Sequence, residues 1–242
     1  MAFAALPASR REAEEVGSLW RALAEAEARP DADVLTGRHA DEGTFKTSSP
    51  GHLVLHVATH GFFLGSDCAA GTTAGRGVVA ISASASRTQA TARARPIENP
   101  LLLSGLALAR ANLRDLARPD DEDGILTAEE VAALDLDGVE WAVLSACDSG
   151  LGQIRGGEGV FGLRRAFKIA GARTVIMSLW PVEDRATRVW MRALYSARLQ
   201  ARRSTADAMR DASLTVLADR RTRKLSTHPF FWAGFVAAGD WR

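Results

Sequence analysis

Two apolar stretches of the chain each lead into a reactive side chain: HLVLHVATHG at residues 52–61 and VEWAVLSACDSG at residues 139–150. Short runs rich in Val and Leu predict buried strands. His60 comes at the carboxyl end of the first run and Cys147 at the end of the second, and a glycine follows closely in each case. Reactive groups of open parallel sheets gather at the carboxyl edge of the strands. We therefore expect a histidine and a cysteine to face each other at one sheet edge.

The segments around these two strands alternate between helical and strand patterns. Helices are predicted at residues 10–29, 127–134, 159–170, 184–199 and 205–220, and further strands at 173–179 and 231–237. The second helix opens with a capping box from Thr127 to Glu130, and Gly171 ends the third. Such alternation indicates an α/β fold with a mostly parallel sheet covered on both faces. We expect a single domain over residues 1–242, with a flexible insertion near residues 66–96.

Composition excludes several classes of protein. The 242 residues carry 30 basic and 29 acidic side chains, a net charge of +1, so neither nucleic acid nor an anionic membrane is an expected partner. No apolar run approaches the length of a membrane span, and the first residues do not resemble a signal peptide. The two cysteines, Cys68 and Cys147, favour free thiols in a reducing cytoplasm, the alternative being one disulfide between them.

A paired cysteine and histidine have a specific chemistry. The thiolate is the nucleophile, and a neighbouring imidazole can accept the thiol proton and later return it to a leaving amine. Backbone N–H groups of Gly61 and Cys147 are candidates to stabilise the negative charge that develops on an attacked carbonyl oxygen. The alternative is structural: cysteine is often buried as a small hydrophobe, and a histidine at a strand end is often a surface group.

Three further patterns suggest ligands, and each has a simpler explanation. His52, His56 and His60 recur every fourth residue, which on a helix would suit zinc, but a strand spreads them by about 3.3 Å per residue. The acidic run at residues 120–123 lacks the EF-hand spacing and is predicted to be a solvated turn. The GGEG sequence at residues 156–159 lacks the Lys-Ser/Thr ending of a phosphate loop. We therefore predict no metal and no cofactor, and keep a zinc hydrolase as a weaker alternative.

The ordered motifs of this chain resemble the CHAT family, a caspase- and separase-like peptidase domain often found behind tetratricopeptide repeats. They include HLVLHVATHGF at 52–62, ENPLLLSG at 98–105, DGILTAEE at 123–130, VLSACDSG at 143–150, GGEGVFGLRRAFKIAG at 156–171, SLWPVED at 178–184 and HPFFWAGFVAAGD at 228–240. The resemblance implies a caspase-like αβα sandwich, with His60 as the general base and Cys147 as the nucleophile. It also implies a tetratricopeptide-repeat region or another regulatory chain as a partner.

The resemblance further implies where a substrate lies. Ser145, two residues before the cysteine, and the stretch from Trp180 to Asp184 match the positions that line the specificity pocket of caspase-like folds. With Asp148 beside the nucleophile, Glu183 and Asp184 would favour a basic substrate side chain. The alternative is that the last two acids only complement a helix N-terminus.

The function that follows is a cysteine endopeptidase that cleaves protein or peptide substrates through an acyl-thioenzyme. The family resemblance suggests a regulated bacterial signalling or defence protease. The alternative is a catalytically silent caspase-like scaffold or peptide-binding module.

Overall fold

The fold contains two four-stranded sheets, and a parallel pair of strands in the first sheet is continued by a parallel pair in the second. The computed structural model describes residues 2–28, 30–63, 101–118, 121–145, 147–148, 158–180 and 182–241. The larger sheet has the order β1 (Val54–Val57), β5 (Trp141–Leu144), β7 (Thr174–Ser178), β8 (Phe235–Gly239). Its first three strands are parallel and β8 is antiparallel to β7. This confirms the prediction of a mostly parallel central sheet.

The smaller sheet continues the first two strands of the larger one. Its order is β4 (Ile125–Thr127), β3 (Ser104–Ala107), β2 (His60–Phe63), β6 (Cys147–Asp148). Strands β2 and β6 are parallel, whereas β3 is antiparallel to both of its neighbours. The chain passes from β1 into β2, and from β5 toward β6, after a break of only two residues. The parallel pair β1–β5 is thereby extended as the parallel pair β2–β6.

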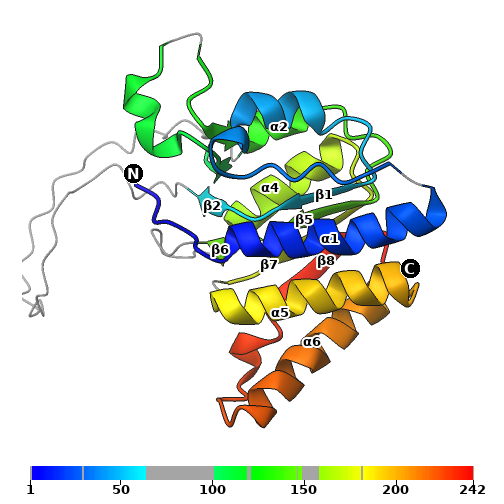
Figure 1. The fold of residues 1–242 in the computed structure, drawn as a ribbon. Helices are drawn as coiled ribbons and strands as arrows, with labels where there is room; N and C mark the ends of the chain where they lie inside the picture. The colour runs from blue at the N-terminus through cyan, green and yellow to red at the C-terminus, as the bar shows by residue number, and fades with distance from the viewer. Residues whose placement is uncertain are drawn as a thin grey trace, which may run out of the picture.

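Helices cover both faces of the larger sheet (Figure 1). On one face α3 (Ala128–Ala132) and α4 (Glu158–Ile169) enclose a core that includes Leu55, Val57, Ala142, Leu144, Phe167 and Val175. On the other face α1 (Ser9–Glu27), α5 (Asp184–Tyr195) and α6 (Thr205–Thr222) enclose Val16, Val143, Ile176, Trp190, Leu194 and Ala212. Alternate residues of the central strands thus enter opposite cores, which explains why these strands are mostly apolar. The result is the predicted αβα sandwich.

Shorter elements complete the described chain. Helix α2 (Glu42–Ser48) lies between α1 and β1, and a π-helical turn at Ser196–Gln200 extends α5. Three 3-10 helices lie at Gly37–His39 (η1), Ala111–Leu116 (η3) and Pro229–Phe231 (η5).

The sequence located most elements of the larger sheet and few of the smaller one. Both hydrogen bonds of the predicted capping box are present at the start of α3. The short strands β3 and β4 were not predicted, because three or four residues give too little alternation to recognise. We expected His60 and Cys147 to end the two apolar strands. Instead, β1 and β5 end three residues earlier, and His60 and Cys147 begin β2 and β6. The predicted insertion near residues 66–96 lies outside the described residues.

The carboxyl end of α4 is defined by a glycine that backbone geometry requires. Gly171 has φ of +115°, and its N–H donates to the carbonyl of Lys168 at 3.3 Å. A Cβ at this position would lie 2.8 Å from the backbone nitrogen of Asp137. Gly138 also has a positive φ, +91°, but a Cβ there would meet no atom within 4 Å.

This difference predicts unequal effects of two matched substitutions. Gly171→Ala combines backbone strain with a backbone clash, and we expect it to lower the free energy of unfolding by about 3 kcal/mol or more. Gly138→Ala adds strain alone, and we expect a loss of about 1 to 2 kcal/mol. Urea denaturation of both variants measures these losses. Equal losses would show that the contact with Asp137 relaxes without cost.

Candidate active site

His60 and Cys147 are direct neighbours in the smaller sheet. The parallel register of β2 and β6 pairs His60 with Cys147 and Gly61 with Asp148. Adjacent strands of a sheet lie about 4.8 Å apart, so the two backbones are close enough for their residues to interact. The register continues that of β1 and β5, in which Val57 pairs with Leu144. The predicted histidine and cysteine positions are therefore brought together by the strand pairing itself.

Hydrogen bonds hold the break between the two sheets. The N–H of Ser145 donates to the carbonyl of Val57 at 2.9 Å, which carries the parallel pairing past the end of β1. The hydroxyl of Thr59 donates to the carbonyl of Ala107 and ties the start of β2 to β3. These contacts leave His60 little freedom to shift along the strand direction.

The imidazole of His60 is buried and has one defined partner. Its exposed fraction is 7%, and its Nε2 lies 2.7 Å from the backbone carbonyl oxygen of Ala4. A carbonyl oxygen can only accept, so Nε2 carries the hydrogen and Nδ1 of the neutral ring is a lone pair. Among the described residues Nδ1 has no hydrogen-bond partner. The ring thus has the protonation pattern of a general base that acts through Nδ1.

Residues before the first helix complete the surroundings of His60. The ring of Phe3 lies 5.6 Å from the His60 ring and 5.9 Å from the Phe62 ring, measured between centroids. Neither Phe3 nor Ala4 was predicted as part of the site. The Ala4 contact leaves no trace in the sequence, because every residue has a backbone carbonyl.

The residues predicted to line a substrate pocket have defined surroundings of their own. Ser145 is buried directly after β5. Trp180 follows β7, its ring stacks on Phe230 with 6.1 Å between centroids, and its Nε1–H donates to the Phe230 carbonyl at 2.9 Å. Ser145 and Trp180 thus lie beyond the carboxyl ends of two parallel strands of the larger sheet, and their role in a substrate pocket stays a prediction. Asp148 is placed by its backbone, in register with Gly61.

The two acids at the start of α5 already have partners. The Glu183 carboxylate pairs with Arg220 at 2.7 Å, and Arg220 is buried, with 6% exposed. Burial and the neighbouring charge of Glu12 raise the pKa of Asp184, while a hydrogen bond from the backbone of Ala8 works in the opposite direction. The ion pair with Arg220 favours the structural alternative for Glu183, whereas the raised pKa of Asp184 means that the fold disfavours its charge.

The three regularly spaced histidines face three different partners. The Nε2 of His56 lies 3.0 Å from Glu12, and its Nδ1 lies 3.1 Å from the hydroxyl of Tyr195. Burial and the charge of Glu12 raise the pKa of that hydroxyl. His52 lies 3.5 Å from Asp33, and His60 contacts Ala4. The His56 network joins β1 to α1 and α5, as a structural histidine would.

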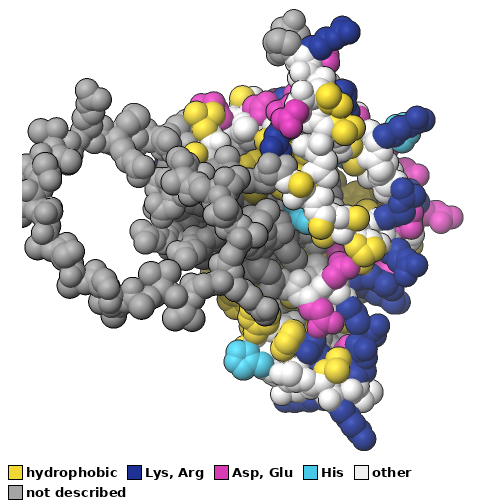
Figure 2. Space-filling model, turned by 90° about the vertical axis from the view of Figure 1, so that its left-hand side faces the viewer, with side chains coloured by type: hydrophobic (Ala, Val, Ile, Leu, Met, Phe, Trp, Pro, Cys, Tyr) yellow, Lys and Arg dark blue, Asp and Glu magenta, His cyan; other side chains and the backbone are white. Residues whose placement is uncertain are grey.

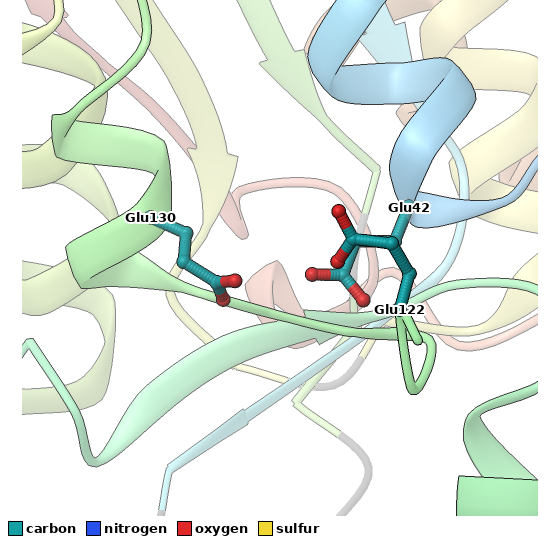
Figure 3. A group of neighbouring side chains, drawn as sticks. All are labelled: Glu42, Glu122 and Glu130. Atoms are coloured by element: carbon teal, nitrogen blue, oxygen red, sulfur yellow. The ribbon is translucent and has the colours of Figure 1, made fainter. Parts of the chain in front are cut away.

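Among the residues that the structure describes, three glutamates form a group of acidic side chains close enough together to hold a cation (Figure 3). The carboxylates of Glu42, Glu122 and Glu130 have ligand atoms within 4.8 Å of one another. The ammonium of Lys46 lies among them, at 2.7 Å from Glu42 and 2.8 Å from each of the other two. The chain thus supplies its own cation. The predicted solvated turn at residues 120–123 agrees with the exposure of Glu122, whose side chain is 48% exposed although it also pairs with Lys46.

The cluster has unequal carboxyl groups. Burial, together with the neighbouring Glu122 and Glu130, raises the pKa of Glu42 from 4.5 to about 7, although Lys46 works against this rise. Burial alone would raise the pKa of Glu130, but hydrogen bonds from Lys46 and Thr127 outweigh it, so the pKa of Glu130 is lowered. Glu42 also accepts a hydrogen bond from the backbone of Gly124 at 3.0 Å. The cluster therefore ties α2 to the turn before β4.

Charges of both signs are interspersed on the molecular face shown in Figure 2, among the described side chains. This mixed distribution agrees with the overall charge balance of 30 basic and 29 acidic residues. Across the described residues, every helix is too short or too polar to span a bilayer.

Comparison with known proteins adds a family to this geometry. The family model for the CHAT domain matches residues 1–240. Tetratricopeptide repeat protein 28 from Homo sapiens is 35% identical over 122 residues, which is 50% of this chain and 5% of that protein. The Mus musculus protein of the same name is 34% identical over 116 residues, 48% of this chain and 4% of that protein. The chain therefore matches only a small part of relatives whose name specifies tetratricopeptide repeats.

The glutamate cluster predicts a pH-dependent effect of one substitution. Between about pH 4.5 and about pH 7 the folded protein keeps a proton on Glu42 that the unfolded chain has lost, so its contribution to stability falls as the pH rises. Glu42→Gln removes this ionisation. Relative to the wild type, we expect the variant to gain up to about 3 kcal/mol of unfolding free energy between about pH 5 and about pH 8.

Urea denaturation at several pH values measures this gain. Glu25→Gln, at an exposed position of α1, is the matched control and should show the same difference from the wild type at every pH. A constant difference for Glu42→Gln as well would contradict the raised pKa of Glu42.

Proposed function

Since the chain belongs to the CHAT domain family, which is caspase-like, we propose that it is a cysteine endopeptidase with Cys147 as nucleophile and His60 as general base. The observation that carries this proposal is the register pairing of these two residues on parallel strands β2 and β6. The Nδ1 of His60 supports it, because this nitrogen has no hydrogen-bond partner among the described residues and a general base needs a free lone pair. The substrate class that we propose is a protein or a peptide.

The proposed reaction begins with proton transfer. Nδ1 of His60 accepts the proton of the Cys147 thiol, and the resulting thiolate attacks the carbonyl carbon of the scissile peptide bond. The negative charge that forms on the carbonyl oxygen is stabilised by the backbone N–H groups of Gly61 and Cys147. Gly61 suits this position because it has no side chain to obstruct an approaching substrate.

The intermediate then collapses to an acyl-thioenzyme. Nδ1–H of the His60 imidazolium gives its proton to the leaving amine, and the carbon–nitrogen bond breaks. A water molecule, deprotonated by the same nitrogen, hydrolyses the thioester and restores the thiol. Throughout this cycle Nε2–H stays hydrogen-bonded to the carbonyl of Ala4, which stabilises the positive ring without accepting its proton.

The setting of this activity is part of the proposal. The names of the two mammalian relatives support a tetratricopeptide-repeat region or a separate regulatory chain as the partner of this domain. A reducing cytoplasm is the compartment that keeps a catalytic thiol free. Ser145, Asp148, Trp180 and Asp184 are the residues that we propose to line the substrate-binding region. The family resemblance suggests a regulated bacterial signalling or defence protease.

The test is cleavage of a peptide library, read by mass spectrometry. We expect Cys147→Ala to abolish cleavage and His60→Ala to lower the rate at least about 100-fold, because the first removes the nucleophile and the second the base. Cys68→Ala is the matched control and should cleave as the wild type does.

Two results would contradict the proposal in different ways. Cleavage by Cys147→Ala at the wild-type rate would exclude this cysteine as the nucleophile. A wild-type protein that yields no Cys147-dependent product, alone or with its tetratricopeptide-repeat partner, would favour the silent scaffold.

A further inference from the structure

The segment before α1, residues 3–6, forms a strap over His60. Figure 1 shows the N-terminal end of the chain beside β2, before it enters α1. The strap contributes the Ala4 carbonyl that accepts from His60 Nε2 at 2.7 Å, and the Phe3 ring beside the His60 ring. The hydrogen bond that defines which nitrogen of His60 is the base therefore comes from outside both sheets.

One side chain fixes the strap from the other side. Asn112, in η3, accepts from the Phe3 N–H at 2.7 Å and donates through Nδ2 to the Phe3 carbonyl at 2.9 Å. An amide side chain offers a donor and an acceptor side by side, and so can pair with both backbone groups of one residue. Asn112 itself is exposed, so these two bonds are its evident structural contribution.

Packing alone does not fix the position of the strap. A cavity of about 1000 Å³ is lined by all four strap residues, by residues 107–113 and by His60 itself. Ala4 and Ala5 are exposed and have only methyl side chains. The Phe3 ring packs beside His60 and Phe62, but Ala4 and Ala5 add only methyl groups over the cavity, so the position of the Ala4 carbonyl depends strongly on the hydrogen bonds of the strap.

We propose that Asn112 is a positioning residue that acts on His60 through the strap. By holding Phe3, it keeps the Ala4 carbonyl on Nε2–H and leaves Nδ1 as the unprotonated nitrogen. Without this clamp the carbonyl moves away, Nε2–H loses its partner, and the ring can rotate or bind its proton at Nδ1. The effect of Asn112 on catalysis rests on the proposed function. Its effect on the hydrogen bond between His60 and Ala4 does not.

The experiment follows the ring N–H of His60 by nuclear magnetic resonance of the full chain labelled at histidine nitrogen. The His60 resonance is assigned by its loss in His60→Ala. In the wild type we expect a resonance at Nε2 and slow exchange of its hydrogen with solvent. Asn112→Ala and Asn112→Asp should each accelerate that exchange at least about tenfold, because the carboxylate of the second variant cannot donate to the Phe3 carbonyl.

Two controls make the result specific. The ring N–H of His56, which faces Glu12 at 3.0 Å, should keep its exchange rate in both variants, since that bond does not involve the strap. Asp115→Ala, on the same 3-10 helix with a side chain that is 93% exposed, should leave both histidines unchanged. If the Asn112 variants leave His60 exchange unchanged, or accelerate His56 equally, the proposal is overturned.

Peptide cleavage then separates this inference from the proposed function. If the wild type cleaves through Cys147, the Asn112 variants should lower kcat about tenfold or more and change KM little, because the base is misplaced while the substrate region is intact. A wild type without Cys147-dependent cleavage would end the proposed function, and the exchange of His60 would still decide the role of Asn112. Slower cleavage by the Asn112 variants with unchanged His60 exchange would also overturn the proposed positioning role of Asn112.

Discussion

The candidate site depends on one register between parallel strands. Strand β1 pairs with β5 and the same alignment carries over to β2 and β6, so the position of His60 opposite Cys147 is fixed far back in the buried sheet. A slip by one residue would move every side chain of β1 from one core to the other. Because Leu55 and Val57 pack in one core while alternate positions of the neighbouring strands pack in the other, such a slip is strongly disfavoured. The hydrophobic cores thus specify the position of a polar pair of residues at the end of the sheet.

A second constraint concerns which nitrogen of each histidine carries a proton. His56 and His60 both direct Nε2 toward the N-terminal part of the chain, His56 to the Glu12 carboxylate in α1 and His60 to the Ala4 carbonyl before it. The two cases differ at Nδ1, which faces the Tyr195 hydroxyl in His56 and has no partner among the described residues in His60. A fully paired ring is suited to holding α1 and α5 on β1. A ring whose Nδ1 has no partner among the described residues is suited to proton transfer, which is the role that we propose for His60.

The parts of the site that the sequence predicted are those that strand patterns specify. Val and Leu around His60 and Cys147 identified two buried strands, and the alternation of strands and helices indicated that they are parallel. The smaller sheet escaped prediction because its strands are short, and because its placement comes from pairing with residues distant in sequence. The Ala4 carbonyl could not be predicted, since it is a backbone group. The ion pair of Glu122 with Lys46 could not be predicted, because the two residues are 76 positions apart and only the fold brings them together.

Charge complementarity with a substrate requires acids whose charge is not already matched. Glu183 is paired with Arg220, which also donates to the Ser226 carbonyl and lies 3.7 Å from the centre of the Phe231 ring. An arginine held by three contacts is part of the fold and does not leave to admit a ligand. Asp184 is engaged by the backbone of Ala8, just before α1. The electrostatic argument for a basic substrate residue therefore does not rest on Glu183; it would rest on Asp148, the acid beside the proposed nucleophile, and on Asp184.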